Sequence, residues 1–206
     1  MGFYDKYVLP RLVDLGGGTK EIIAERQKCL AEVRGDVLEV GFGTGHNLPY
    51  YPSGVRKIVG VDPSSQSAKL AKKRIEKVSF PVEFVELAGE KIDAPSESFD
   101  SVVCTFTLCT IPDPHAALLQ MNRVLKPDGR FFFLEHGRAD DPKVRRWQDR
   151  LNGLQNWLVG GCNLNREIDQ LISSAGFVID TLDRYYAKTG PKPFSYFYRG
   201  IARRSA

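Results

Sequence analysis

The stretch Val37-Leu38-Glu39-Val40-Gly41-Phe42-Gly43-Thr44-Gly45 decides the fold of this 206-residue chain. An apolar run with one internal acid, Glu39, gives way to alternating glycines, and Asp62 follows 21 residues after Gly41. A glycine-rich turn at the end of a strand lets the backbone approach a ligand closely. An acid about 20 residues further on, at the end of the next strand, is suited to hydrogen-bond a ribose. Together, the turn and the acid predict a nucleoside-cofactor site.

The spacing of the glycines separates this site from those that bind dinucleotides. The dinucleotide fingerprint is G-x-G-x-x-G, in which the third glycine allows close packing of a helix against the strand. Here the pattern is G-x-G-x-G, His46 stands in the place of the third glycine, and the chain contains no G-x-x-x-x-G-K-[ST] phosphate loop. Glu39 would repel a polyphosphate but suits a cationic ligand. The pattern favours S-adenosylmethionine, which has a sulfonium and an ammonium but no phosphate, over NAD. The alternative is a tight strand–helix turn that binds no ligand.

Composition describes an ordinary soluble globular domain. Hydrophobic residues make up 42% and charged residues 26% of the chain, whose length fits one domain. The formal charge of +4, from 29 basic and 25 acidic residues, is too small and too scattered to indicate nucleic-acid binding. No apolar run approaches the roughly 18 residues that a membrane span requires.

Four cysteines without paired spacing predict reduced thiols and a cytoplasmic protein. The three histidines are scattered, and none stands at the short spacing from another ligand that is typical of a zinc site, so we expect no metal. Nothing in the sequence indicates an oligomeric state.

Strand and helix patterns alternate along the chain and predict an α/β fold. We expect a Rossmann-like, doubly wound, mostly parallel seven-stranded sheet with helices on both faces. The expected strands are 36–41, 57–61, 82–86, 100–106, 130–135, 177–184 and a last one near 194–202, and the expected helices are about 45–50, 65–77, 114–125 and 165–175. Pro127 and Gly129 are expected to end the third of these helices in a turn before the next strand.

The single domain, residues 1–206, has two further helical parts. An N-terminal helical segment, 1–34, includes a helix that Thr19 caps. An inserted helical cover over about 137–165 carries Trp147 and Trp157 at helical spacing, and we expect it to lie over the site. For either tryptophan alone, core packing is the simpler interpretation.

The sequence resembles the class I S-adenosylmethionine-dependent methyltransferases from about residue 35 to the C-terminus. Within that superfamily, several stretches are similar to the methyltransferase-like thiol S-methyltransferases. These stretches are Gly43–Pro52, Ala88-Gly89-Glu90, Val103–Cys109, Leu134-Glu135-His136 and Gly161–Glu167. Eukaryotic members of the family carry an N-terminal membrane anchor, whereas this chain begins almost at the soluble fold.

The resemblance implies a cofactor site for S-adenosylmethionine, with S-adenosylhomocysteine as product. The residues assigned to the cofactor are Glu39, Gly41, Phe42, Gly43, Gly45, Asn47, Asp62, Pro63, Ala88, Gly89, Glu90 and Thr105. Many class I members place an acid for the adenine amino group where this chain has Ala88. Adenine contact would then fall to the backbone near Gly89 or to Glu90.

The resemblance also implies that the acceptor is a small thiol or hydrosulfide. His136, at the end of a strand, is the candidate base, or else a hydrogen-bonded residue at a strand end. Cys109 lies in the stretch expected to border the methyl group, and it either takes part in catalysis or is a small buried apolar residue. Arg166 would attract a thiolate, or else pair with Glu167 or Asp169.

Three rival functions stay open. The first is a methyltransferase of the same fold that acts on carbon, nitrogen or oxygen of a quinone or lipid-like molecule. The second is a regulatory module that binds S-adenosylmethionine as a sensor without turnover. The third is a nicotinamide oxidoreductase, which the pattern disfavours because the chain lacks the third glycine of the dinucleotide fingerprint.

Overall fold

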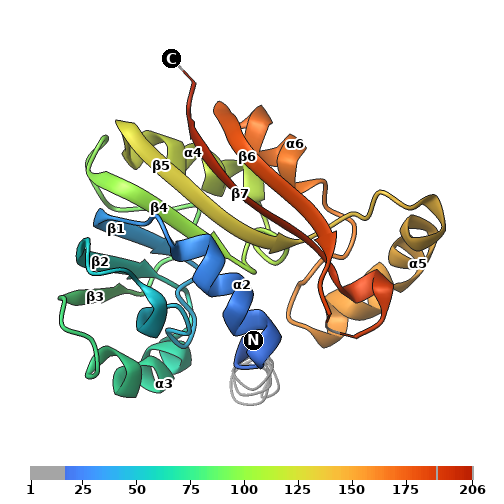
Figure 1. Cartoon of the computed structure of the whole chain (residues 1–206), viewed down its shortest axis with the longest axis horizontal. Coiled ribbons are helices and arrows are strands. Elements are labelled where there is room, and N and C mark those ends of the chain that lie inside the picture. The colour runs from blue at the N-terminus through green and yellow to red at the C-terminus, as the bar shows by residue number, and fades with distance from the viewer. Residues whose placement is uncertain (1–16, 189, 206) are drawn as a thin grey trace.

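A central sheet organises the chain (Figure 1). The computed structural model describes residues 17–188 and 190–205. The strands are β1 (Gly35–Val40), β2 (Val55–Val61), β3 (Val82–Val85), β4 (Phe99–Thr105), β5 (Leu125–His136), β6 (Phe177–Tyr186) and β7 (Tyr196–Arg204). Their order in the sheet is β3-β2-β1-β4-β5-β7-β6, and only the pairings of β7 with β5 and β6 are antiparallel. The expected Rossmann-like, mostly parallel seven-stranded fold is confirmed.

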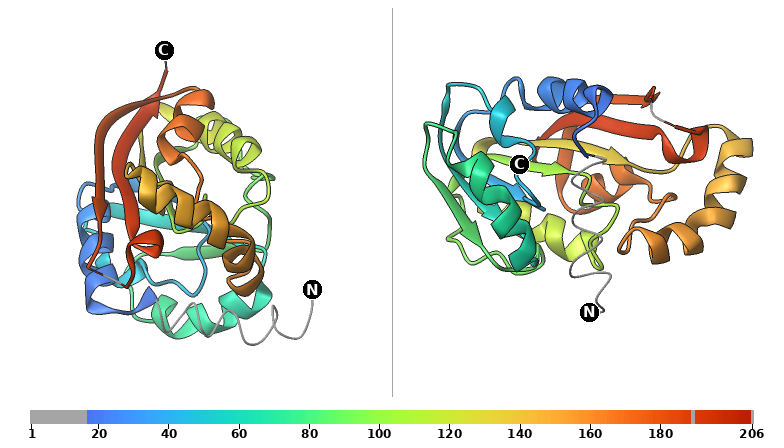
Figure 2. Two further views of the ribbon diagram at one scale, coloured as in Figure 1. Left: turned by 90° about the vertical axis from the view of Figure 1, so that its right-hand side faces the viewer. Right: turned by 90° about the horizontal axis from the view of Figure 1, so that it is seen from below.

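Helices cover both faces of the sheet (Figures 1 and 2). The helical elements are α2 (Lys20–Leu30), the 3-10 turn η2 (Leu48–Tyr50), α3 (Ser65–Ile75), α4 (Pro114–Val124), α5 (Pro142–Leu158), α6 (Ile168–Ser174) and the 3-10 turn η3 (Lys192–Phe194). Helices α2 and α3 pack on one apolar layer, and α4 and α6 pack on the other. The two layers follow from the alternation of side chains along each strand, since Val37 of β1 enters the first layer and Leu38 the second.

Local capping explains where the helices begin. The Thr19 hydroxyl accepts a hydrogen bond from the Ile22 N–H at 3.5 Å at the start of α2, as the sequence predicts. Asp113 and Asp141 cap α4 and α5 in the same way, and each is followed by a proline that needs no N–H partner. The earlier part of the segment expected to be helical over 1–34, up to residue 16, lies outside the described residues.

Two expectations about local structure are wrong. The helix expected over 45–50 is only the three-residue turn η2, since Pro49 and Pro52 leave little room for a longer helix. The turn expected at Pro127 and Gly129 is part of β5, because α4 already ends at Val124. The pairing with β4 shifts register between Phe99, which faces Leu125, and Ser101, which faces Arg130. Pro127 and Gly129 lie in the part of β5 between these two pairs.

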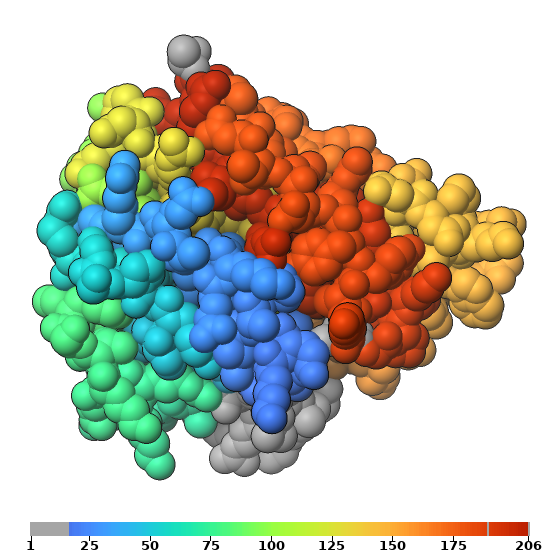
Figure 3. All heavy atoms as spheres, in the orientation of Figure 1, coloured from blue at the N-terminus to red at the C-terminus, as the bar shows by residue number. Residues whose placement is uncertain are grey.

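Helix α5 exposes most of its large apolar side chains, although Val144 packs in the core. It extends from one end of the molecule (Figures 2 and 3), with Trp147 55% and Trp157 75% exposed. Its inner face includes a polar anchor: the buried Gln148 amide donates to the carbonyls of Gly137 at 2.9 Å and Pro193 at 3.2 Å. Core packing, the simpler interpretation of either tryptophan, is therefore wrong.

Candidate functional site

The predicted site residues gather at one edge of the sheet. Strands β1 to β5 are parallel, so the segments that follow their carboxyl ends meet there. The chain crosses from β3 at the sheet edge back to β4 beside β1, which creates the switch in strand order where α/β proteins bind ligands. The edge brings together the glycine turn 41–45 after β1, Asp62 after β2, the loop 106–111 after β4 and His136 at the end of β5.

The three glycines of the turn serve two purposes. Gly41, Gly43 and Gly45 have φ angles of 74°, 54° and 76°. A Cβ on Gly41 would lie 1.9 Å from the Thr107 hydroxyl, so this glycine allows the loop after β4 to pack on the turn. A Cβ on Gly43 would meet no atom closer than the Gly41 carbonyl at 3.8 Å. Gly43 therefore leaves room beside the backbone that no described protein atom fills.

Asp62 is fixed beside that space. Its two oxygens accept hydrogen bonds from the N–H groups of Gly43 and Ser64, each at 2.9 Å. The Ser67 side chain also hydrogen-bonds to this carboxylate. A carboxylate offers about four acceptor positions, so capacity remains for a ribose hydroxyl. The contact between Asp62 and Gly43 joins the two halves of the predicted motif directly.

Glu39 lies beneath the turn and is 1% exposed. Its oxygens accept from the Asn47 amide and the Tyr51 hydroxyl, each at 2.7 Å. Burial raises the pKa of the carboxyl from 4.5 to about 7, against the lowering effect of these hydrogen bonds and of Arg26. A cationic ligand nearby would stabilise the ionised form.

Arg26, a buried arginine of α2, completes this network and was not predicted. One guanidinium nitrogen donates to the Asn47 amide oxygen and to the Thr105 hydroxyl, both at 2.8 Å. The guanidinium also lies 5.1 Å from the centre of the Phe106 ring. The sequence holds a signal for this role, because Arg26 falls on the same helical face as Cys29 and Leu30.

The loop after β4 is held by a buried carboxylate. Glu135, which is fully buried, accepts from the N–H groups of Thr107, Leu108 and Cys109 at 2.8, 3.0 and 3.2 Å. Phe106 turns the chain toward it with a φ of 54°, which is rare for a bulky residue. Burial raises the pKa of Glu135 despite these three donors. Backbone strain and a buried acid at one loop are common at functional sites.

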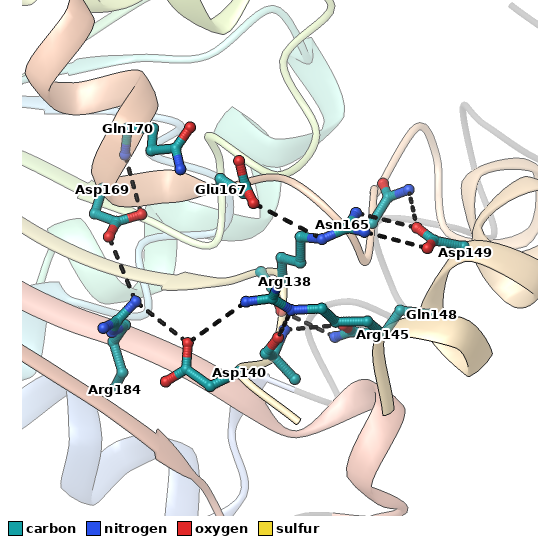
Figure 4. A network of polar contacts seen from close by, with 12 residues as sticks. Arg138, Asp140, Arg145, Gln148, Asp149, Asn165, Glu167, Asp169, Gln170 and Arg184 are labelled. Atoms are coloured by element: carbon teal, nitrogen blue, oxygen red, sulfur yellow. Dashed lines mark hydrogen bonds and ion pairs between the residues drawn. The ribbon is translucent and has the colours of Figure 1, made fainter. Parts of the chain in front are cut away.

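Arg166 holds the same loop from the other side. Its guanidinium donates to the carbonyls of Leu108 and Ile111, the second at 2.7 Å. The two pairings weighed for it from sequence are made by other arginines: Glu167 lies 3.8 Å from Arg138 and Asp169 3.6 Å from Arg184 (Figure 4).

The segment that carries Arg166 is itself anchored to α5. The Asn165 amide donates to Asp149 at 3.0 Å (Figure 4). The Arg138 N–H donates to the Arg166 carbonyl at 2.9 Å. Arg138 also pairs with Asp149 at 3.1 Å. Helix α5 thus holds the segment that carries Arg166 through Asp149.

Two cysteines and a histidine meet at the end of this loop. The sulfurs of Cys109 and Cys162 lie 3.7 Å apart, and the Cys162 sulfur lies 3.7 Å from His136 Nδ1. All three residues are buried. The hydrogen bond between the sulfurs lowers the pKa of Cys162, with a further contribution from His136, and raises the pKa of Cys109. One thiolate would therefore be stabilised in this pair.

The remaining predicted residues take structural or peripheral positions. Phe42 is buried edge-to-face against Phe84, with ring centres 5.8 Å apart. Gly89 lies where a Cβ would come 2.9 Å from Val40. Glu90 accepts from the Asp113 N–H at 3.3 Å, which leaves its second oxygen for another donor. Pro63 is exposed and Ala88 half-buried.

Comparison with known proteins places this arrangement in a family. A model of the methyltransferase domain matches residues 38–133. Phosphatidylethanolamine N-methyltransferase of Cereibacter sphaeroides is 32% identical over 138 residues, which cover 65% of this chain and 68% of that protein. The chain belongs to the S-adenosylmethionine-dependent methyltransferases.

Two further relatives of this methyltransferase domain are informative. Human thiol S-methyltransferase TMT1A is 38% identical over 145 residues, which cover 68% of this chain and 59% of the human protein. The chain thus spans about three fifths of the length of that relative. The crystal structure of YcgJ from Bacillus subtilis has a TM-score of 0.69 at 19% identity, covers 89% of this chain and 98% of its own, and shares the fold.

The geometry fits the cofactor of the family, S-adenosylmethionine. Space beside Gly43, free acceptor positions on Asp62 and a buried acid at Glu39 suit a ribose and a cationic amino-acid group. Over residues 17–188 and 190–205, the methyltransferase domain has no helix that is both long and apolar enough to cross a membrane.

Proposed function

We propose that this domain transfers the methyl group of S-adenosylmethionine to the sulfur of a small thiol or hydrosulfide. The observation that carries the proposal is the cluster of Cys109, His136 and Cys162 at the same sheet edge as the glycine turn. Thr107, two residues before Cys109, packs directly on Gly41. The similarity to human thiol S-methyltransferase TMT1A supports a sulfur acceptor.

The chain's own residues would hold and orient the cofactor. Asp62 would accept from the ribose hydroxyls, and Glu39 would attract the ammonium directly or through water. The peptide groups around Gly43 would lie against the ligand. Adenine would lie near Gly89, where Glu90 has one carboxylate oxygen with no hydrogen bond to a described residue.

Methyl transfer from a sulfonium is an in-line displacement, so positioning is the protein's main contribution. Holding reactants in line can supply roughly 7–11 kcal/mol in favourable cases. A lone pair of the acceptor sulfur forms the new bond to the methyl carbon while the bond from that carbon to the sulfonium breaks. The electron pair of the broken bond stays on the sulfur of S-adenosylhomocysteine. Glu135 and Arg166 would position the loop 106–111 through its backbone, and this loop would border the methyl group.

The acceptor must lose its proton, because a thiolate is the nucleophilic form. In a metal-free reaction, His136 would take this proton, since an imidazole titrates near neutral pH. Cys109 and Cys162 would form a soft, apolar surround for the acceptor sulfur. The distances among the three side chains support these roles.

A second candidate function is methylation of a quinone or of a lipid headgroup. Its support is the 32% identity to phosphatidylethanolamine N-methyltransferase and the 31% identity to a ubiquinone/menaquinone C-methyltransferase of Hahella chejuensis. Binding of S-adenosylmethionine with no turnover on any acceptor would instead support a sensor module.

Matched acceptors distinguish these functions. We would measure S-adenosylhomocysteine formation with thiophenol and phenol, with butanethiol and butylamine, and with sulfide, a quinol and phosphatidylethanolamine. Each of the first two pairs keeps the carbon skeleton and changes the nucleophile. The proposal expects thiophenol to be methylated faster than phenol, and butanethiol faster than butylamine. It also expects sulfide to be methylated faster than the quinol and phosphatidylethanolamine. Faster turnover of phenol, amine, quinol or lipid would overturn it.

We also propose that the protein works in the cytoplasm. All four cysteines are free and buried, which suits a reducing compartment. Fractionation of the cells that produce the protein would test this.

A further inference from the structure

We propose that Cys109, His136 and Cys162 bind a zinc ion. The ligand atoms of these three side chains all lie within 4.8 Å of one another. A metal at this position was not expected from the sequence, because the ligands stand 27 and 26 residues apart. The fold assembles them: Cys109 follows β4, His136 ends the neighbouring β5, and Cys162 follows α5.

Two of the three ligand separations match those of tetrahedral zinc coordination. With Zn–S bonds of about 2.3 Å and Zn–N bonds of about 2.0–2.1 Å, tetrahedral angles place two sulfurs about 3.8 Å apart and sulfur and nitrogen about 3.6 Å apart. The observed separations are 3.7 Å between the sulfurs and 3.7 Å between the Cys162 sulfur and His136 Nδ1. The third separation, between the Cys109 sulfur and a nitrogen of His136, lies within 4.8 Å.

The charges and the surroundings also fit. Two thiolates and a neutral imidazole would balance the charge of Zn²⁺, which a buried site needs. The elements that carry the ligands are rigidly held: the Cys109 N–H donates to Glu135 at 3.2 Å, and the Asn163 N–H donates to the Cys109 carbonyl at 2.8 Å. Such outer contacts orient metal ligands.

Three ligands leave a fourth position open, as in catalytic zinc sites. Within the described part of the chain, the cluster offers only these three ligand atoms. The open position would take a soft donor such as the sulfur of a small thiol. On coordination the thiol would release its proton to solvent, and after methyl transfer the neutral thioether, a weaker ligand, would leave. This second step rests on the proposed function, whereas the metal site does not.

Cobalt substitution tests the site without reference to activity. The full chain, reduced and stripped of metal, is titrated with Co²⁺. We expect one ion per chain, with the visible bands of tetrahedral cobalt and a near-ultraviolet thiolate-to-cobalt band. Zn²⁺ should displace it, and the protein purified from zinc-containing medium should hold one zinc. A reduced, folded chain that shows none of these bands would overturn the proposal.

Variants locate the ion. Cys162→Ser should lower metal affinity at least tenfold, whereas Cys29→Ser, which removes a buried thiol on α2, should not. His136→Cys keeps a ligand but removes the imidazole, so it should retain cobalt with a stronger thiolate band. Binding of S-adenosylmethionine by each variant would show that it is folded. Unchanged cobalt binding in Cys162→Ser, or its loss in His136→Cys with the cofactor still bound, would contradict the assignment. Metal binding without thiol methylation would leave the site established and refute only the proposed acceptor.

Discussion

Replacing Glu39 by glutamine should stabilise the cofactor-free protein at alkaline pH. The buried carboxyl has its pKa raised to about 7 from 4.5, mainly by desolvation. A raised pKa means that the folded state holds the proton more tightly than the unfolded chain. The corresponding stability is complete below pH 4.5 and is lost as the pH rises through 7. Glutamine keeps an acceptor for Asn47 and cannot ionise.

The magnitude follows from the same values. At 1.36 kcal/mol per pKa unit, the rise from 4.5 to about 7 corresponds to about 3 kcal/mol. Glu39→Gln should therefore gain about 3 kcal/mol over the wild type at pH 8 and under about 1 kcal/mol at pH 5. Urea unfolding at both pH values measures this difference. Glu83→Gln, which removes a charge from an exposed residue of β3, controls for net charge.

The same substitution should weaken cofactor binding. The ionised carboxylate attracts the ammonium, so wild-type affinity should increase as the pH rises through 7, and the variant should lack this increase. A stability difference that is equal at pH 5 and pH 8, or a variant less stable than the wild type at pH 8, would refute the reasoning.

Three further substitutions test the site. Gly43→Ala and Gly190→Ala each place a Cβ in open space at a positive φ, so each should cost roughly 1–2 kcal/mol of stability. Calorimetry should show loss of S-adenosylmethionine binding only in Gly43→Ala. Equal affinities of the two variants would contradict a cofactor position beside Gly43. Asp62→Ala should lose roughly 1–3 kcal/mol of cofactor affinity, and wild-type affinity would remove its role. His136→Ala should lower turnover by roughly 10²–10⁴ with cofactor affinity almost unchanged. In a metal-free reaction this loss of turnover should shrink as the pH rises through the pKa of the acceptor thiol. Full activity of His136→Ala at neutral pH would exclude His136 as the base.

The sequence predicts the central strands β1, β4 and β5 well because each contains a buried apolar run. The glycine turn and Asp62 are also predictable, and the structure joins them by a hydrogen bond between Gly43 and Asp62. Helix α5 misleads, because an apolar stripe predicts a buried face. In the structure the Trp157 side faces solvent, while the buried residues of the helix are Val144 and the polar Gln148.

The three-residue cluster could not be predicted, for a different reason. Cys109, His136 and Cys162 belong to separate elements, and only the adjacency of β4 and β5 and the return of the chain after α5 bring them together. Short ligand spacing, the usual sequence signal for a metal, is absent when the fold assembles the site over long range. Arg26 differs, since its place on the apolar face of α2 is visible in the sequence.

The most direct test of the central claim follows the methyl group itself. S-adenosylmethionine labelled with ¹³C in the methyl group is incubated with the protein and one mixture containing a thiol, a phenol, an amine and a quinol. Nuclear magnetic resonance then identifies the atom to which the label is bonded. If the site at this edge of the sheet transfers the methyl group to the sulfur of the small thiol, a new S-methyl signal should grow as the labelled cofactor disappears. Label on oxygen, nitrogen or carbon, or label that stays in the cofactor, would contradict it.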